Sequence, residues 1–186
     1  MKKTVIKYLP LFILVVGLSS CFKENPYFED FASTQPTADI PKAKANALLS
    51  ATPTASWFTL DSSAAGVDYA TAVHIAAKDH VGDVTVRMKI DQQAGQTWVT
   101  AHPTYSLLPD SLYSVANYDV LIPNAGVFTT ADFIVHIKTG AVDPANGKSI
   151  FKTHKYILPV AIDTVVSHPF VIESNFRNIL WLINVK

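Results

Sequence analysis

Apolar and polar residues alternate with a period of two in several stretches that begin at about residue 57. The clearest is DVTVRMKID at 83–91, where Val84, Val86 and Met88 alternate with charged or hydroxyl side chains. Such alternation is typical of a strand with one buried face and one solvated face. The pattern predicts strands at 67–76, 83–91, 118–122, 130–138, 155–163 and 178–186.

Two of these stretches also indicate a position in the sheet. In 155–163, Pro159 has the opposite parity to the apolar Tyr156 and Leu158. Because proline has no N–H to donate, we expect this strand at an edge or a bulge. The last stretch, 178–186, is apolar at both parities, which predicts a central strand covered on both faces.

Turn-forming residues separate the predicted strands, at PNAG (123–126), DPANG (143–147) and SHP (167–169). Six or seven strands divided by such turns favour an antiparallel β-sandwich over a βαβ fold. The β region of about 130 residues suits one domain with a full core. We therefore predict an all-β, immunoglobulin-like sandwich of about seven antiparallel strands over 57–186.

The first twenty residues have the layout of a secretory signal. Three lysines among the first seven residues precede an apolar run at 8–18, and two serines follow it. A transmembrane helix, the alternative, needs roughly 20 apolar residues. This run is about half that length and contains Pro10, so we predict a signal peptide over 1–20 that is removed.

Leu18-Ser19-Ser20-Cys21 resembles the bacterial lipobox, in which small residues precede a cysteine that becomes the new N-terminus. A thiol is nucleophilic enough to form a thioether with a diacylglycerol. A stray or structural cysteine behind an ordinary cleavage site is the alternative. As the only cysteine, Cys21 makes no internal disulfide. The resemblance implies that Cys21 is lipidated and that its partner is a membrane.

Residues 21–56 are predicted to form the lipidated N-terminus and an extended tether. Four prolines lie there among alanine, serine and threonine, and such stretches are semi-rigid. A short helix is predicted at 42–49. Lys23-Glu24 resembles the charged tether that sends Bacteroidetes lipoproteins to the outer face of the outer membrane; a solvated linker is the alternative. The expected location is the outer membrane, at the cell surface, with the periplasmic face as the alternative.

The charge balance argues against a nucleic-acid partner. The whole chain has 15 basic and 15 acidic residues, and removal of 1–20 takes three lysines and no acid. The remaining 12 basic and 15 acidic residues give a formal net charge of −3. Nucleic-acid binding needs a basic surface to neutralise phosphates. No nucleic-acid partner is expected.

Catalytic and metal-binding motifs are also missing from the sequence. There is no G-x-S-x-G elbow, and the six histidines form no H-x-x-x-H pair. Glutamate occurs only at positions 24, 29 and 173, which disfavours a paired-carboxylate glycosidase. We expect His74 and His136 to face solvent or to be hydrogen-bonded locally. A non-enzymatic protein without metal or cofactor is predicted.

Aromatic residues outside the predicted strands are candidates for ligand binding, because sugars are held by flat aromatic faces with polar neighbours. Trp98 and Tyr105 lie in QTWVTAHPTY, a segment that resembles a loop, and Tyr113 follows in LLPDSLYSV. We consider these three aromatics as a possible ligand platform. The alternative is that they cover one end of the sandwich as peripheral core.

Four segments, taken in order, resemble one family: LLPDSLYSV (107–115), YDVLIPNAG (118–126), KYILPVAI (155–162) and NILWLINVK (178–186). The family is an N-terminal domain of unknown function in Bacteroidetes surface lipoproteins, often encoded in polysaccharide-utilisation loci. Its immunoglobulin-like domain often precedes a second domain. The resemblance implies an accessory module for glycan capture or presentation, with polysaccharide as partner. The alternative is an assembly module that packs against another surface lipoprotein without a small-molecule ligand.

Overall fold

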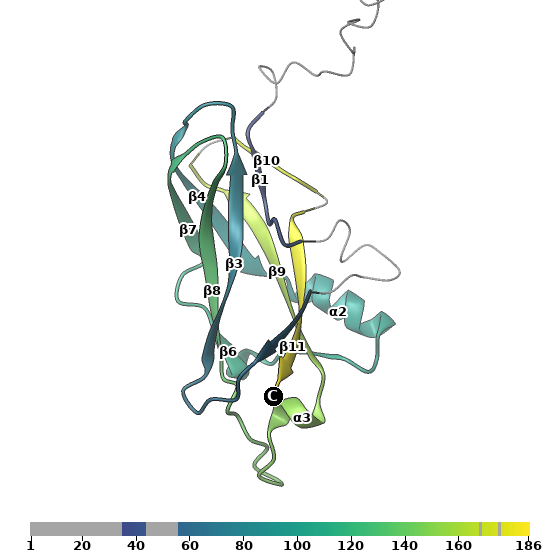
Figure 1. Cartoon of the computed structure of the whole chain (residues 1–186). Coiled ribbons are helices and arrows are strands. Elements are labelled where there is room, and N and C mark those ends of the chain that lie inside the picture. Colours follow the sequence, from purple (N-terminus) through teal and green to yellow (C-terminus); the bar gives the residue numbers. More distant parts are fainter. Residues whose placement is uncertain (1–34, 44–55, 168, 175) are drawn as a thin grey trace, which may run out of the picture. The chain divides into compact units, whose positions relative to one another are not determined.

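The computed structural model describes residues 35–43, 56–167, 169–174 and 176–186, which belong to one compact unit, Gln35–Lys186 (Figure 1). The predicted signal peptide, the lipidation site and most of the predicted tether and its helix lie outside the described residues. No helix within the described ranges is long and apolar enough to cross a membrane.

Two β-sheets pack face to face in this unit. The first sheet contains, in spatial order, β10 (Val171–Ile172), β1 (Thr37–Asp39), β3 (Val67–Ala76), β8 (Thr129–Ile137) and β6 (Tyr113–Ser114). The second contains β2 (Ser56–Leu60), β11 (Asn178–Val185), β9 (Tyr156–Val165), β4 (Gly82–Ile90) and β7 (Asp119–Ala125), with β5 (Ser106–Leu107) beside β9. Seven described strands have five or more residues, so the predicted β-sandwich is confirmed.

The long strands pair antiparallel, as predicted, but three edge or end pairs do not. β3 pairs antiparallel with β8, and β9 pairs antiparallel with both β4 and β11. The parallel pairs are β1 with β10, β2 with β11 and β5 with β9. Each parallel pair joins segments that are distant in sequence, which period-two alternation does not reveal.

The core lies between the sheets and consists of the apolar side chains at alternate positions of each strand. Val73 and Phe133 from the first sheet face Val86 and Trp181 from the second, and all four are buried. Trp181 meets the ring of Tyr69 edge to face, with centroids 4.7 Å apart. Burying apolar surface at about 25 cal/mol per Å² makes this layer the main source of stability.

The 155–163 strand was predicted to lie at an edge or at a bulge, and the edge is wrong. A register irregularity does occur in its pairing with β4, where Asp163 is the extra residue, four residues away from Pro159. β9 lies between β4 and β11, and Pro159 pairs with Leu180 of β11. The Pro159 carbonyl accepts a hydrogen bond from the N–H of Asp91, just beyond the end of β4. The N and C=O of one residue point to the same side of a strand, so the missing N–H faces a place where β4 has already ended.

The domain begins earlier than residue 57. Thr37–Asp39, which the sequence analysis assigns to the tether, forms β1 and pairs with β3 and β10. A strand of three residues, with Ala38 as its only apolar side chain, is too short to show an alternating pattern in the sequence. The ordered unit therefore includes residues that were predicted to be an extended linker.

Two of the predicted turns can be compared with the structure. Asp143 accepts a hydrogen bond from the N–H of Gly147 at 2.8 Å, so DPANG is a tight turn as predicted. The PNAG segment is not a turn, because β7 continues to Ala125 and the chain reverses at 126–128. The third, at 167–169, includes residue 168, which lies outside the described residues.

Candidate functional site

The segment that resembles a loop in the sequence is a helix, α2 (Gln92–Ala101), which covers the outer face of the second sheet (Figure 1). Asp91 caps its N-terminus, because the Asp91 Oδ1 accepts a hydrogen bond from the N–H of Ala94 at 3.1 Å. Gly95 lets the helix approach the sheet closely. A Cβ at Gly95 would lie 2.6 Å from side-chain carbons of Leu107 and Pro159.

Trp98 is the residue that fixes α2 to the sheet. Its side chain is 7% exposed and packs against Ile157, Leu180 and Leu182 on the outer face of β9 and β11. These contacts explain why β11 is apolar at both parities, and they confirm that it is a central strand covered on both faces. One face of Trp98 is thus peripheral core.

Two further rings surround Trp98. The imidazole of His102 is stacked on the indole, with centroids 4.0 Å apart and an interplanar angle of 11°. Tyr105 meets the indole edge to face at 5.2 Å, and the Lys155 Nζ lies 5.7 Å from the Tyr105 ring centroid. We call Trp98, His102, Tyr105 and Lys155 the ring cluster. His102 and Tyr105 are partly exposed, so the cluster presents two rings to solvent.

The third aromatic candidate, Tyr113, does not join the ring cluster. Its hydroxyl donates to the Asp110 Oδ1 at 2.7 Å and accepts from the Gln92 side chain at 3.2 Å. Burial, together with the hydrogen bond to Asp110, raises the pKa of Tyr113 well above its ordinary value. The hydroxyl therefore ties the first turn of α2 to the short 3₁₀ helix at Asp110–Leu112.

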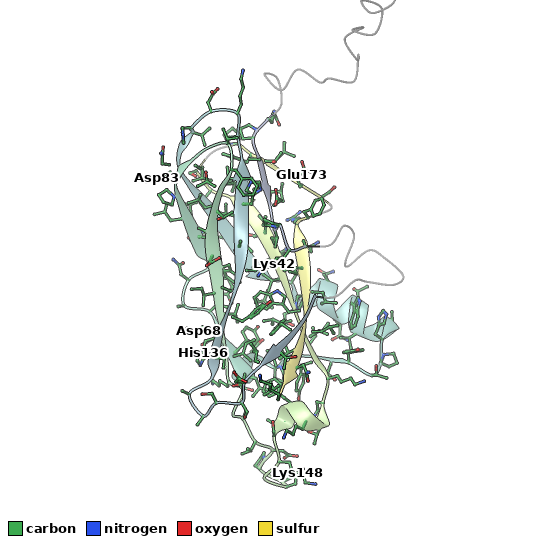
Figure 2. The ribbon with its side chains drawn as sticks, viewed as in Figure 1. Lys42, Asp68, Asp83, His136, Lys148 and Glu173 are labelled. Atoms are coloured by element: carbon green, nitrogen blue, oxygen red, sulfur yellow. The ribbon has the colours of Figure 1, made fainter. Side chains whose placement is uncertain are left out.

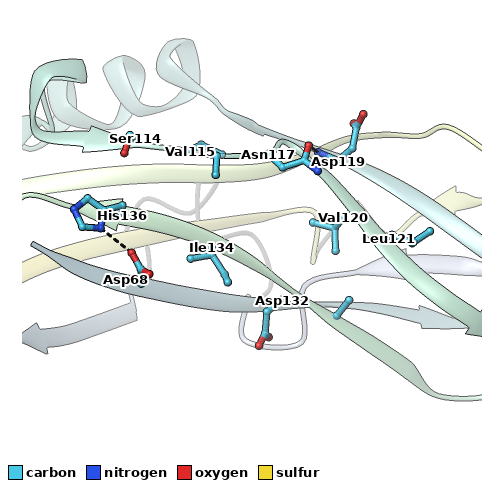
Figure 3. Close-up of a pocket in the computed structure, with 12 residues that line it drawn as sticks. Asp68, Ser114, Val115, Asn117, Asp119, Val120, Leu121, Asp132, Ile134 and His136 are labelled. Atoms are coloured by element: carbon cyan, nitrogen blue, oxygen red, sulfur yellow. Dashed lines mark hydrogen bonds and ion pairs between the residues drawn. The ribbon is translucent and has the colours of Figure 1, made fainter.

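A second surface feature is a groove of about 560 Å³ beside β8 (Figure 3). One wall is β8 and β3; the other is β7 and the segment that links β6 to β7 (Figure 3). The lining residues are Asp68, Ser114, Val115, Ala116, Asn117, Asp119, Val120, Leu121, Ala131, Asp132, Ile134 and His136. This lining contains no Phe, Tyr or Trp, which distinguishes the groove from the ring cluster.

Ser114, His136 and Asp68 lie next to one another on β6, β8 and β3, and Figure 2 labels the last two. His136 Nδ1 contacts Asp68 Oδ1 at 2.7 Å. A nucleophilic triad would need the other nitrogen, Nε2, within reach of the serine hydroxyl. Nε2 instead lies against Gly66, where an added Cβ would collide with it. The row of three residues therefore lacks the geometry of a triad.

The carboxylates of the groove differ in their partners. Asp119 receives two hydrogen bonds from Arg87, at 2.7 and 2.9 Å, and these lower the pKa of Asp119 below its ordinary value. Asp68 is held by His136. Asp132 has no ion pair or hydrogen bond in the described part of the chain, and no lysine or arginine lines the groove. The groove is therefore acidic.

The histidines on the outer face of the first sheet are bonded locally. His74 is buried, and its Nδ1 contacts Asp39 Oδ2 at 2.9 Å beneath the ring of Phe128. His136 is paired with Asp68, as described above. Among the described residues, no group of three or more His, Cys, Asp or Glu side chains is placed to hold a metal ion.

The sequence analysis missed both α2 and the groove. The spacing of Ala94, Trp98 and Ala101 at i, i+4 and i+7, directly after an N-capping Asp91, is a helix signal. Gly95 and two threonines weaken that signal. For the groove there is no comparable signal, because its residues come from three separate stretches, at 68, 114–121 and 131–136, that only the topology brings together.

Two packed sheets with one helix on the outer face define the chain as a β-sandwich module. The model of a protein family described as an N-terminal domain matches residues 44–169, more than half of the chain. The chain therefore belongs to this family of N-terminal domains, which is a Bacteroidetes domain of the kind that the sequence motifs resemble. No protein of curated function matches the sequence.

Three solved structures are similar to this chain at low sequence identity. A two-domain protein of unknown function from Bacteroides fragilis matches with a TM-score of 0.53 and 12% identity, over 82% of this chain and 46% of that one. A candidate carbohydrate-binding protein from Bacteroides ovatus gives a TM-score of 0.49 and 11% identity, over 70% of this chain and 35% of that one. EndoBT-3987 of Bacteroides thetaiotaomicron, solved with a Man5GlcNAc product, gives a TM-score of 0.47 and 19% identity, over 73% of this chain and 29% of that one. The chain spans less than half the length of each.

Proposed function

We propose that this protein is a non-enzymatic, lipid-anchored module at the cell surface that captures or presents glycans through the ring cluster. The observation that carries the proposal is the stack of His102 on Trp98, with Tyr105 and Lys155 beside it. These four residues combine flat rings with hydrogen-bonding groups on one surface. The membership of a Bacteroidetes domain family agrees with this role.

Sugar rings have apolar C–H faces and a rim of hydroxyl groups. The C–H faces pack on aromatic rings, and the hydroxyls need donors and acceptors nearby. In the ring cluster, His102 and Tyr105 would supply the exposed rings, and Lys155 would supply a donor. Trp98 would hold them in place from behind. The groove offers no aromatic face, so it is the weaker candidate for a sugar.

Anchoring is proposed to occur through Cys21. One acyl chain binds a membrane only marginally, whereas two or more hold a protein durably. A diacylglyceryl cysteine carries two, so this attachment needs no membrane-spanning helix. Labelling cells with a palmitate analogue tests the proposal: the label should appear in the protein and should be absent from Cys21→Ser. A labelled Cys21→Ser protein would contradict it.

Glycan binding can be tested by affinity electrophoresis of the full chain in mild detergent, in gels that contain plant or host polysaccharides. We expect at least one polysaccharide to retard the protein. Tyr105→Ala and His102→Ala should each weaken the retention about 3- to 10-fold, the value of one aromatic contact. Asp79→Ala, an exposed change remote from α2, is the control and should bind normally. Equal binding by all three variants would contradict the assignment.

The non-enzymatic part of the proposal has its own test. The protein that binds a polysaccharide should release no reducing ends from it over a long incubation. Release that survives further purification and disappears in a variant of a single carboxylate would contradict this part while leaving the binding role intact.

A second candidate, an assembly module without a small-molecule ligand, is favoured by the turn between β7 and β8. Val127 and Phe128 are 68% and 74% exposed there, the most exposed large apolar side chains among the described residues. Two neighbouring apolar side chains in water suit a protein contact. Cross-linking on intact cells should capture one specific protein, and Val127→Ser should abolish that cross-link if this candidate is correct.

A further inference from the structure

β8 has an edge that is only partly occupied. On one side it pairs with β3 along its whole length, from Thr129 to Ile137. On the other side, among the described strands, it pairs only with β6, at Ile137 and His136. β6 has two residues, after which the chain leaves the sheet and crosses to β7. Within the described part of the chain, the edge of β8 from Thr129 to Val135 is therefore open along the groove.

The direction of the backbone groups at this edge follows from one hydrogen bond. The N–H of Lys138 donates to the carbonyl of Leu112, on the β6 side. Alternate residues of a strand direct their N–H and C=O to the same side. The backbone groups of Ile134 and Asp132 therefore point outward from the open edge. Both residues are exposed, so these groups are available to another chain.

Two large apolar side chains next to this edge are exposed, which is unusual for a strand that faces only solvent. Ile134 on β8 is 50% exposed, and Leu121 on β7, across the groove, is 56% exposed. Figure 3 shows them on the two walls, with Asp132 on the β8 side. An open edge with apolar side chains beside it is the arrangement that accepts an added strand, in which main-chain hydrogen bonds give affinity and alternate side chains give specificity.

We propose that the open edge of β8 binds an extended segment of another protein as an added β-strand, and that this segment carries basic and apolar side chains in turn at every second residue, on the face that it shares with Asp132 and Ile134. The charge of the groove selects the basic residues. Among the described residues, Asp132 has no partner and no lysine or arginine lines the groove, and Asp68 and Asp119 lie close to it. A basic side chain beside Asp132 and an apolar one beside Ile134, two residues along, complement this edge.

A second copy of this chain offers no complementary charge to Asp132 at the same edge. In an antiparallel pair of two β8 strands, one symmetric register would place Asp132 opposite its own copy. The next would place each Asp132 opposite an Ile134. Like charges directly opposite each other are destabilising, and a charge opposite an apolar side chain gains nothing. Asp132 thus acts against self-association at an edge that remains open to a basic strand.

The test uses the full chain in detergent micelles and three synthetic peptides. The first is Lys-Thr-Val-Thr-Lys-Thr-Val, which places lysine and valine in turn on one face of the added strand; the second replaces both lysines by glutamate; the third keeps the lysines but is N-methylated at alternate residues. We expect only the first to bind. Its binding should slow hydrogen exchange at the amides of Asp132 and Ile134, because these N–H groups become bonded to the peptide.

Variants connect the binding to the edge. Asp132→Lys should weaken the lysine peptide about tenfold or more, since it replaces an attractive cross-strand pair with a repulsive one. Asp79→Lys, an equal charge change outside the groove, should have a much smaller effect. Tyr105→Ala, which tests the ring cluster, should bind the peptide normally.

Several results would overturn the proposal. Equal binding of the N-methylated peptide would show that backbone pairing is absent, and equal binding of the glutamate peptide would show that the charge is irrelevant. Protection of the two amides in the free protein, together with a dimer in analytical ultracentrifugation, would identify a second copy as the occupant. Glycan retention lost in Asp132→Lys but kept in Tyr105→Ala would assign the groove to sugar instead.

Discussion

The imidazole of His102 lies parallel to the indole of Trp98, and its Nδ1 is 2.9 Å from the Trp98 carbonyl oxygen. A carbonyl only accepts hydrogen bonds, so Nδ1 is the donor. In the neutral imidazole, Nε2 is therefore the acceptor. One short contact thus fixes both the plane of the ring and the position of its free acceptor, which is what a preorganised contact to a sugar hydroxyl needs.

Removal of the Trp98 indole should lower the stability of the fold, so a loss of binding in that variant would not by itself identify a ligand contact. Trp98→Ala deletes the side chain that covers Ile157, Leu180 and Leu182, and truncation of a buried Trp costs about 3–5 kcal/mol. We expect urea unfolding to show a decrease of that size in the free energy of unfolding. Tyr105→Ala, at a partly exposed ring, should lose much less. Similar losses in the two variants would contradict the division between a buried anchor and exposed rings.

Gly95 gives a second test of how closely α2 packs. In an isolated helix, alanine is better than glycine by about 1 kcal/mol. Here the new Cβ would lie 2.6 Å from Leu107 and from the rigid ring of Pro159. Overpacking of this kind costs about 1–3 kcal/mol. We therefore expect Gly95→Ala to be net destabilising, by up to about 2 kcal/mol, in urea unfolding. An increase in stability would mean that α2 moves freely away from β9.

These contacts show what alternation in a sequence can and cannot predict. Strands β3, β4 and β8 were predictable because a half-buried strand places every second side chain in the core. The interior position of β9 was not, because Pro159 suggests an edge. The structure places its missing N–H just beyond the end of β4. Short strands such as β1 and β6 have too few residues to show a period.

The candidate sites were predictable to different degrees. The structure brings Trp98 and Tyr105 together, and their role in ligand binding stays a prediction. Tyr113, chosen for the same reason, lies apart because its hydroxyl is bonded to Asp110 and Gln92. His102 follows Trp98 by four residues in the sequence, and the helical turn between them brings the two rings onto the same face. The groove depends entirely on topology, since β7 and β8 belong to different sheets.

The cap of α2 should contribute measurably to its stability. Asp91→Ala removes the side-chain acceptor for the Ala94 N–H, and loss of an N-cap costs about 0.5–2 kcal/mol. It also removes the 3.5 Å contact of Lys89 with Asp91, which adds little at a partly exposed pair. Asp91→Asn is the matched control, since asparagine caps equally well without charge. Equal losses in urea unfolding would show that the ion pair, and not the cap, is responsible.

Tyr113 should make the fold sensitive to high pH. Burial and the hydrogen bond to Asp110 raise the pKa of Tyr113 in the folded protein, whereas an unfolded tyrosine titrates near its ordinary value of about 10. Since the folded state holds the proton more tightly, the contribution to stability is complete below about pH 10. It decreases as the pH rises from there towards the folded pKa.

The measurement is a comparison of the protein with Tyr113→Phe. Absorbance at the tyrosinate band should show one tyrosine fewer that ionises together with unfolding in Tyr113→Phe than in the parent. The loss of unfolding free energy between neutral and alkaline pH should be smaller in Tyr113→Phe. Part of the loss should persist, because burial also raises the pKa of Tyr69 and of Tyr156. An identical pH dependence in both proteins would show that the Tyr113 hydroxyl is free to ionise in the folded state.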